Sequence, residues 1–330
     1  MQAAYYSRQG PAREVLVLSE LNTPLPGPGE IRVRIRASGI NPADVKRRAG
    51  APARPMCWPI VIPHSDGAGT VDAVGRGVRS VKEGDRVWVW NAQWRQPFGT
   101  AAEHVVVPEC QAVALPPAVP FDVGAAVGVP GLTAHRCLSV VSPLACERAL
   151  VYGAAGAIGF LLVQLLKSRG THVTAVVSSD RKREIALSAG ADEALDYSKP
   201  TFASELDRVG GSDRFRFIAD VDMGAHCASY TCNAARHGHI VVFGSASNMQ
   251  PSVDVLALQK HGVSLHFIAG ADQPPRHVAE ALDEINRGLA SGALTPRIQS
   301  RFPLREIASA HELVEAGSLE GKVILEVMHD

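Results

Sequence analysis

Residues 151–159 read Val151-Tyr152-Gly153-Ala154-Ala155-Gly156-Ala157-Ile158-Gly159, and this stretch decides the fold. The apolar run 149–152 predicts a buried strand, and the apolar stretch 160–166 predicts a helix that ends at Gly170. Small residues at such a turn let the backbone approach a pyrophosphate, and the first helical turn offers N–H groups and the positive end of the dipole. The spacing departs from GxGxxG, because Ala154 stands where the first glycine is expected. The stretch predicts a dinucleotide-binding unit, with tight packing of helix against strand as the alternative.

The same pattern of strand and helix continues along the chain. Residues 172–177, 216–221 and 239–243 read as strands, and 181–189 reads as a helix that ends at Gly190. Strand and helix alternate until about residue 270, which predicts a doubly wound parallel sheet.

The remaining segments have a different texture. The first third is rich in Val, Gly and Pro, and its extended runs 31–37, 69–74 and 86–89 are separated by turn residues, which predicts a β-rich, barrel-like domain. The tail returns to a helix at 276–291 and a last apolar strand at 322–327. We expect that strand to rejoin the first domain.

Composition limits the possible partners. The chain has 330 residues, 46% of them hydrophobic, which is too long for one typical domain. Lys+Arg and Asp+Glu each number 33, so no summed charge attracts nucleic acid or an anionic membrane. The first residues lack a signal-peptide pattern and no apolar run reaches the roughly 20 residues of a membrane helix, so we expect a cytoplasmic protein. The cysteines are scattered without paired spacing, which favours reduced thiols; they are residues 57, 110, 137, 146, 227 and 232.

The end of the second parallel strand indicates which dinucleotide binds. An NAD site usually has Asp or Glu there, about 20 residues after the glycine turn, to hold the ribose 2′-hydroxyl. Here Ser178 and Ser179 are followed by Asp180, Arg181 and Lys182. Hydroxyls and cations suit a 2′-phosphate, so NADPH is preferred to NADH. The alternative is that both cations are ordinary solvated residues, and Asp180 counts against a phosphate.

Several motifs now identify a family. They occur in order as Ser38–Asp44, Pro63–Gly69, Gly84–Val87, Gly131–Ala134, Gly190–Asp192, Val242–Ser245 and Gly321–Val323. With them the chain resembles, over nearly its whole length, the zinc-independent quinone oxidoreductase (zeta-crystallin-like) branch of the medium-chain dehydrogenase/reductases. The resemblance implies an α/β protein in which a Rossmann domain is inserted into a GroES-like catalytic domain. The predicted domains are a discontinuous GroES-like domain, 1–121 with 271–330, and a Rossmann NADPH-binding domain, 122–270.

The residues at the zinc positions of related enzymes argue against a metal. Zinc relatives carry Cys and His where this chain has Asn41 and Ser65, and neither is a first-choice zinc ligand. No lobe of four cysteines occurs in residues 89–106. The other possible ligands lack the usual spacing; they are Cys57, His64, Asp66 and His104. We therefore expect hydride transfer from NADPH to an already electrophilic acceptor, a quinone or a carbonyl-conjugated alkene, with catalysis mainly by positioning.

The resemblance also implies which residues hold NADPH. They are Ala155, Gly156, Ala157 and Ile158 at the pyrophosphate, Ser178, Ser179 and Lys182 at the adenosine phosphate, Tyr197 at the adenine side, and Phe243, Gly244 and Ser245 at the nicotinamide ribose. Asn41 and Thr133 match positions that border the nicotinamide pocket, although each also suits a turn or helix cap. Lys46 departs from the family pattern and either contacts phosphate or is solvated.

Two further residues are candidates for the substrate pocket. His64 stands where a glycine is common, and it either hydrogen-bonds an acceptor oxygen or is structural. Trp94 either contacts a planar substrate or packs in the interior, whereas alternation predicts that Trp88 and Trp90 share one face of a strand in the core. No catalytic side chain is assigned, and the carboxylates Asp44 and Asp66 are expected to cap backbone N–H groups.

The sequence is also compatible with two other functions. An enoyl-thioester reductase would need a basic entrance, which Arg47, Arg48 and Arg54 could form. A non-catalytic NADPH-binding protein is the other alternative, because the family resembled includes lens structural proteins. We also expect a homodimer through antiparallel pairing of the apolar segment 263–269, which would be hazardous as an unpaired edge.

Overall fold

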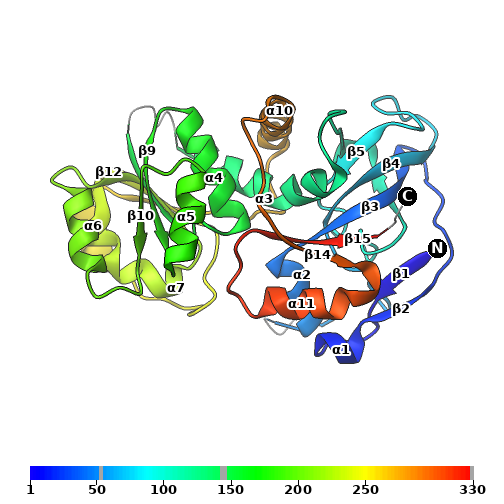
Figure 1. Ribbon diagram of the computed structural model, residues 1–330, viewed down its shortest axis with the longest axis horizontal. Coiled ribbons are helices and arrows are strands. Elements are labelled where there is room, and N and C mark those ends of the chain that lie inside the picture. The colour runs from blue at the N-terminus through cyan, green and yellow to red at the C-terminus, as the bar shows by residue number, and fades with distance from the viewer. Residues whose placement is uncertain (52–54, 142–146, 328–330) are drawn as a thin grey trace. The chain divides into compact units, whose positions relative to one another are not determined.

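The computed structural model describes residues 1–51, 55–141 and 147–327 (Figure 1). The chain divides into two compact units, residues 1–129 with 282–330 and residues 130–281. We call them the outer unit and the inserted unit and describe each by itself. The predicted domain boundaries, 1–121 with 271–330 and 122–270, stay a prediction.

The inserted unit is built on a six-stranded parallel sheet in the order β10-β9-β8-β11-β12-β13. The strands are β8 (Arg148–Tyr152), β9 (His172–Val177), β10 (Glu193–Asp196), β11 (Phe215–Asp220), β12 (Ala234–Val242) and β13 (Ser264–Phe267). The central strands β8, β9 and β11 are mostly apolar and buried, because both faces of a parallel sheet are covered. The strand order reverses between β8 and β11, as the doubly wound prediction requires.

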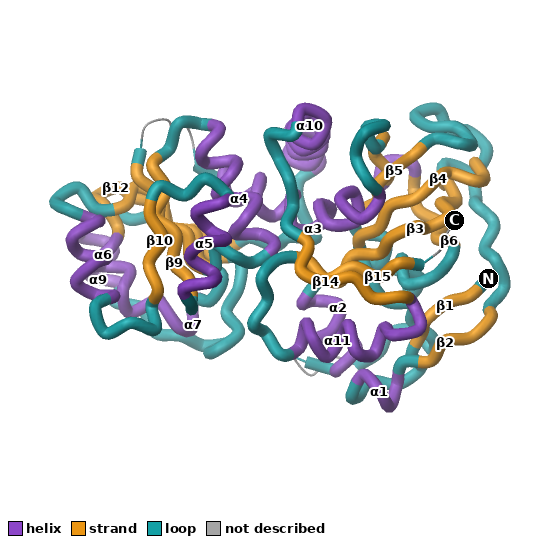
Figure 2. The backbone as a smooth tube through the Cα atoms, in the orientation of Figure 1, coloured by secondary structure: helices purple, strands orange, loops and turns teal. Residues whose placement is uncertain are grey.

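Helices connect these strands (Figure 2). They are α4 (Ala157–Ser168), α5 (Asp180–Ser188), α6 (Phe202–Gly210), α7 (Met223–His226), α8 (Tyr230–Asn233) and α9 (Val255–His261). The connection from β11 to β12 contains only the short helices α7 and α8 with a 3-10 turn between them, so it is less regular than the predicted alternation.

The outer unit is β-rich. Its main sheet runs β14-β15-β3-β4-β5-β7, with β6 also paired to β3. These strands are β3 (Glu30–Ile40), β4 (Asp66–Val74), β5 (Arg86–Val89), β6 (His104–Pro108), β7 (Ala112–Ala114), β14 (Ile298–Pro303) and β15 (Lys322–Glu326). β15 pairs antiparallel with β3, so the prediction that the last strand rejoins the first segment is confirmed.

Smaller elements complete this unit. They are β1 (Gln2–Tyr5) paired with β2 (Val17–Glu20), and the helices α1 (Ala12–Val15), α2 (Pro42–Ala49) and α11 (Ile307–Glu315). Two longer helices, α3 (Phe121–Ser139) and α10 (Pro275–Ser291), contain the points where the chain passes between the units.

Trp88 and Trp90 differ in burial: Trp88 is buried and Trp90 is half-buried. Trp88 lies on β5 with no exposed surface, and its indole N–H donates to the side-chain oxygen of Asn286 (3.3 Å). β5 ends at Val89, so Trp90 lies beyond the strand, where its backbone N–H donates to the carbonyl of Gln111. A Cβ at Gly124 of α3 would lie 3.3 Å from the Trp88 Cβ, and one at Gly128 would lie 3.3 Å from the Trp90 Cβ, so both side chains face α3. The predicted shared face is therefore confirmed, although the strand itself ends at Val89.

Candidate functional site

The glycine turn joins β8 to α4 in a conformation that needs glycine at two positions. Gly153 has φ +70°, and its N–H donates to the carbonyl of Val176. A Cβ at Gly159 would lie 2.3 Å from the carbonyl oxygen of Gly153, so close packing explains that residue. Gly156 is different, because a Cβ there would meet only one atom, at 3.3 Å. Packing does not account for Gly156, and its small size leaves room for a ligand to approach.

The first turn of α4 suits an anion. Gly156 is the N-cap of this 12-residue helix, and no side chain caps it in the part of the chain that the structure describes. The N–H groups of Ala157 and Ile158 have no partner within the helix because they belong to its first turn, and both residues are only half-buried. Ala155, the preceding residue of the predicted set, is buried. The turn therefore offers backbone donors and a helix dipole to a pyrophosphate.

The carboxyl end of β9 brings a cation to a serine hydroxyl. The Lys182 Nζ donates to the Ser178 Oγ (3.1 Å), and the Ser179 Oγ caps α5 by accepting from the Lys182 N–H (3.3 Å). Asp180 is exposed and pairs with Lys199 (2.9 Å) and Arg183 (3.3 Å), and these hydrogen bonds lower the pKa of its carboxyl group. Lys199 and Arg183 thus balance the charge of Asp180, and the Lys182 ammonium group contacts the Ser178 hydroxyl instead of this carboxylate.

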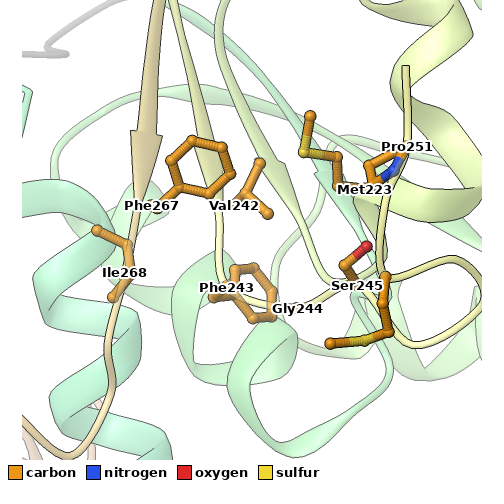
Figure 3. Close-up of a pocket in the computed structure, with 9 residues that line it drawn as sticks. Met223, Val242, Phe243, Gly244, Ser245, Pro251, Phe267 and Ile268 are labelled. Carbon is orange, nitrogen blue, oxygen red and sulfur yellow. The ribbon is translucent and has the colours of Figure 1, made fainter. Parts of the chain in front are cut away.

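Tyr197 and the segment after β12 occupy the same end of the sheet. The Tyr197 N–H donates to the Val177 carbonyl (3.0 Å), so this exposed tyrosine lies beside the end of β9. A cavity of about 280 Å³ opens at the ends of β12 and β13 (Figure 3). It is mainly apolar, and its lining residues are Met223, Val242, Phe243, Gly244, Ser245, Met249, Pro251, Phe267 and Ile268.

Sequence reasoning missed a second polar cluster at this end of the sheet. Asp220 is the last residue of β11 and is fully buried, and its carboxylate contacts His226 and Tyr230. The available signal was an acidic residue at the carboxyl end of a parallel strand, the place where such folds bind ligands.

In the outer unit, Asn41 belongs to a buried network. Its Nδ2 donates to the Asp66 Oδ2 (2.8 Å), and the Lys322 Nζ donates to both the Asn41 Oδ1 (2.5 Å) and the Asp66 Oδ2 (2.9 Å). The other carboxylate oxygen of Asp66 accepts from the Val129 N–H (2.8 Å). The expected capping role therefore holds for only one oxygen of Asp66, because the other binds Lys322 and Asn41.

Asn41 also begins α2. Its N–H donates to the Asp44 Oδ2 (2.8 Å), which confirms the expected cap. Burial raises the pKa of Asp44 to about 6, against the opposing charge of Arg47. Lys46 lies exposed on the same helix. Thr133 is buried on α3 in the inserted unit.

His64 and Trp94 differ in their surroundings. His64 is fully buried at φ +80°, its Nδ1 lies 2.9 Å from the Ser38 Oγ, and its Nε2 lies 2.8 Å from the Nε2 of His311. Both ring nitrogens are engaged inside the protein, which favours the structural interpretation. Trp94 is half-buried, and the Arg95 guanidinium lies 5.3 Å from the centre of its ring.

The other candidates for metal binding or a basic entrance are engaged separately. Among the described residues, no group of three or more His, Cys, Asp or Glu side chains is arranged to hold a metal ion. His104 pairs with Asp72 (3.1 Å), and Cys57 is exposed. Arg48 is fully buried against Glu315 and the Gly10 carbonyl. It therefore cannot form part of a basic entrance, contrary to the alternative considered from sequence. Arg54 lies outside the described residues.

Comparison with known proteins agrees with this architecture. Residues 27–117 match the alcohol dehydrogenase GroES-like domain, and residues 189–325 match a domain described as zinc-binding dehydrogenase. A quinone oxidoreductase of Pseudomonas aeruginosa is 32% identical over 320 residues, which cover 94% of this chain and 95% of that protein. The chain belongs to the quinone oxidoreductase family of the medium-chain dehydrogenase/reductases.

Solved structures confirm the predicted fold of this quinone oxidoreductase family member. Escherichia coli quinone oxidoreductase complexed with NADPH is 26% identical, with a TM-score of 0.88 over 99% of this chain and 100% of that one. An NAD-dependent alcohol dehydrogenase is 27% identical, with a TM-score of 0.89 over the same shares. The outer unit is thus the GroES-like part and the inserted unit the Rossmann part. No helix within the described ranges is long and apolar enough to cross a membrane.

Proposed function

We propose that this protein is an NADPH-dependent reductase that transfers hydride, without a metal, to quinones or other electron-poor conjugated carbonyl compounds. The contact of Lys182 with Ser178 at the end of β9 carries the proposal. A carboxylate at that place would hold the 2′-hydroxyl of NADH, whereas an ammonium and a hydroxyl stabilise a 2′-phosphate. The NADPH complex of the Escherichia coli relative supports this assignment.

The residues of the inserted unit suit NADPH, which supplies a hydride from its nicotinamide ring when bound. The N–H groups of Ala157 and Ile158 would hold the pyrophosphate. Ser178 and Lys182 would hold the 2′-phosphate, with Tyr197 beside them. The segment 243–245 would line the nicotinamide-ribose side, where it forms part of the mainly apolar cavity.

In the outer unit, the network around Asn41 supports a metal-free reaction. Lys322 and Asp66 fix the direction of the amide, so its oxygen faces an ammonium group. The ammonium group beside this oxygen repels a second cation, which argues against zinc binding there. The amide nitrogen keeps a second hydrogen, which Asn41 would present to a ligand in a fixed direction. We propose that Asn41 and Thr133 border the nicotinamide and that Trp94 contacts the substrate.

Turnover of chelator-treated protein tests the proposal. NADPH oxidation, followed by the loss of its near-ultraviolet absorbance, is measured with benzoquinone, a small enone and a crotonyl thioester, with NADH in parallel. We expect chelation to leave activity unchanged, and NADPH and the first two acceptors to be preferred. Loss of activity on chelation contradicts a metal-free reaction, and preference for the thioester contradicts the acceptor. Tight NADPH binding without oxidation by any acceptor would instead indicate a non-catalytic protein.

We further propose that two copies pair through β13. This strand lies at one end of the parallel sheet, and Phe267 on it is exposed. An apolar edge strand is protected when a second copy continues the sheet. Sedimentation should show a dimer, and a monomer at all concentrations would contradict the pairing.

A further inference from the structure

The carboxyl end of β11 carries a buried carboxylate that holds an imidazole. Asp220 has no exposed surface, and its Oδ1 lies 2.8 Å from the His226 Nδ1 and accepts from the Asp222 N–H (2.8 Å). Its Oδ2 accepts from the Tyr230 hydroxyl (2.7 Å). Burial and the charge of Asp220 raise the pKa of Tyr230, so this hydroxyl keeps its proton and donates. The remaining contact requires the His226 Nδ1 to carry a hydrogen.

His226 lies where the parallel sheet changes direction. Its ring stacks on Tyr152, with ring centres 4.2 Å apart and an angle of 19° between the planes. Tyr152 is the last residue of β8, directly before the glycine turn, whereas Asp220 ends β11. These two strands are neighbours at the reversal of strand order, the position where doubly wound sheets bind dinucleotides. Figure 1 shows α7, which carries His226, at one end of this sheet.

The same imidazole approaches Tyr197, the residue assigned to the adenine side. Its ring centre is 6.3 Å from that of Tyr197, at an angle of 58°. Tyr197 in turn is hydrogen-bonded through its N–H to Val177, the neighbour of Ser178. His226 therefore connects the glycine turn with the end of β9.

The hydrogen bond to Asp220 decides which edge of the imidazole a ligand meets. Nδ1 faces a carboxylate without exposed surface, yet the His226 side chain is 20% exposed. Tyr152 covers one face of the ring, and Nε2 is not among the buried nitrogens without a partner in the described residues, so solvent reaches the edge that carries Nε2. Because Nδ1 holds the hydrogen, Nε2 of the neutral ring is a hydrogen-bond acceptor.

We propose that His226 binds the adenine base of NADPH and accepts a hydrogen bond from its 6-amino group through Nε2. Asp220 is the positioning residue that fixes the ring and its tautomer. The proposal rests on the proposed function, because that function supplies the ligand. Adenine suits this place for two reasons. Its aromatic ring can pack against the rings of His226 and Tyr197, and its 6-amino group can donate a hydrogen bond to Nε2.

Binding of base-modified cofactors tests the proposal. Dissociation constants are measured by nicotinamide fluorescence for NADPH, its hypoxanthine analogue and reduced nicotinamide mononucleotide. The hypoxanthine analogue has a carbonyl in place of the 6-amino group, and the mononucleotide lacks the adenosine end. The native protein should bind NADPH about 2- to 10-fold more tightly than the hypoxanthine analogue, the value of one hydrogen bond.

Two variants and a control locate the effect at His226. His226→Phe keeps an aromatic ring on Tyr152 but lacks Nε2, so it should lose about 2- to 10-fold in NADPH affinity and no longer discriminate against the analogue. Asp220→Asn can present a donor to Nδ1 and should reduce the discrimination as well. The control His172→Phe changes an exposed residue at the start of β9 and should keep it.

Three results would overturn the inference. The first is equal affinity of the native protein for NADPH and its hypoxanthine analogue. The second is that His226→Phe still binds NADPH more tightly than the analogue, by the native ratio. The third is weaker binding of reduced nicotinamide mononucleotide by His226→Phe, which would indicate a structural role. Failure of the native protein to bind NADPH at all would instead contradict the proposed function.

Discussion

Each unit of the molecule contains a lysine–aspartate pair at nearly the same distance, but in different surroundings. Lys322 and Asp66 in the outer unit are 2.9 Å apart, with side chains 2% and 0% exposed. Lys167 and Asp192 in the inserted unit are 2.7 Å apart, with both side chains 31% exposed. The outer unit thus keeps charges in its interior, where each depends on its partner. The parallel sheet has an apolar interior and places polar groups at the ends of its strands, where a ligand can reach them.

The largest expected effect is loss of the buried pair. Lys322→Met leaves the carboxylate of Asp66 buried without its cation, and should lower the free energy of unfolding by about 3–5 kcal/mol. Chemical denaturation measures the change. The double variant Lys322→Met/Asp66→Leu should recover part of the loss, because it removes the uncompensated charge. An effect below about 1 kcal/mol for the single variant, typical of a surface pair, would contradict the assigned interior position.

The buried histidines of the outer unit should make its stability depend on pH. Burial lowers the pKa of His64 well below its usual value, and lowers that of His311 to about 3. The unfolded chain then binds more protons than the folded one below about pH 6.5, so stability falls as the pH drops from there towards 3. His311 alone should contribute on the order of 3 kcal/mol between pH 6.5 and pH 4.

Denaturation of His64→Gly/His311→Leu at a series of pH values checks this origin. Glycine suits the positive φ of residue 64, and the curve of the double variant should be flatter than the native one. Asp44 acts in the opposite direction, because burial raises the pKa of this acid to about 6 and stability therefore rises as the pH falls from 6 towards 4. Parallel curves for the two proteins would show that the histidine pair is not the source.

The glycine turn should tolerate little change in volume. Gly159→Ala places a Cβ 2.3 Å from the carbonyl oxygen of Gly153, and should cost about 1–3 kcal/mol because backbone atoms must move. We expect NADPH affinity to fall with it. Thermal denaturation and cofactor titration measure the two effects. Ser168→Ala on the same helix is the control, and an equal effect there would mean that packing at the turn is not special.

The smallest effect is expected at the exposed pair. Lys167→Met should change the free energy of unfolding by no more than about 1 kcal/mol, because water already solvates both charges in part. Chemical denaturation beside Lys322→Met gives the comparison directly. Equal losses in the two variants would mean that burial does not distinguish the two pairs.

Local features of the molecule could be predicted from sequence. The predicted strands 172–177 and 86–89 have the observed bounds. The first lies between Gly170-Thr171 and Ser178-Ser179, so turn residues mark its two ends. Ser178 and Lys182 lie on either side of the start of α5, and the composition of this segment alone indicated a phosphate site. β10 was missed because it has only four residues, with acids at both ends.

Contacts between distant segments could not be predicted. Lys322 is 256 residues from Asp66, and His311 is 247 residues from His64, so neither pair has a local signal. The direction of the Asn41 amide depends on both partners and therefore on the finished fold. His226 is an intermediate case, because it lies six residues from Asp220 but needs Tyr152, from another strand, to define its position.

The central claim is that Ser178 and Lys182, at the end of β9, bind the 2′-phosphate of NADPH. Measuring cofactor affinity tests this claim most directly. Dissociation constants for NADPH and NADH are measured on the native protein, on Lys182→Gln, and on Lys260→Gln, an exposed lysine of α9. The native protein should prefer NADPH, and Lys182→Gln should lose about 10- to 100-fold in NADPH affinity with no change for NADH, since a charge-assisted hydrogen bond contributes about 1.5–3 kcal/mol. Lys260→Gln should match the native protein. Preference for NADH, or equal losses for both cofactors in Lys182→Gln, would contradict the 2′-phosphate site.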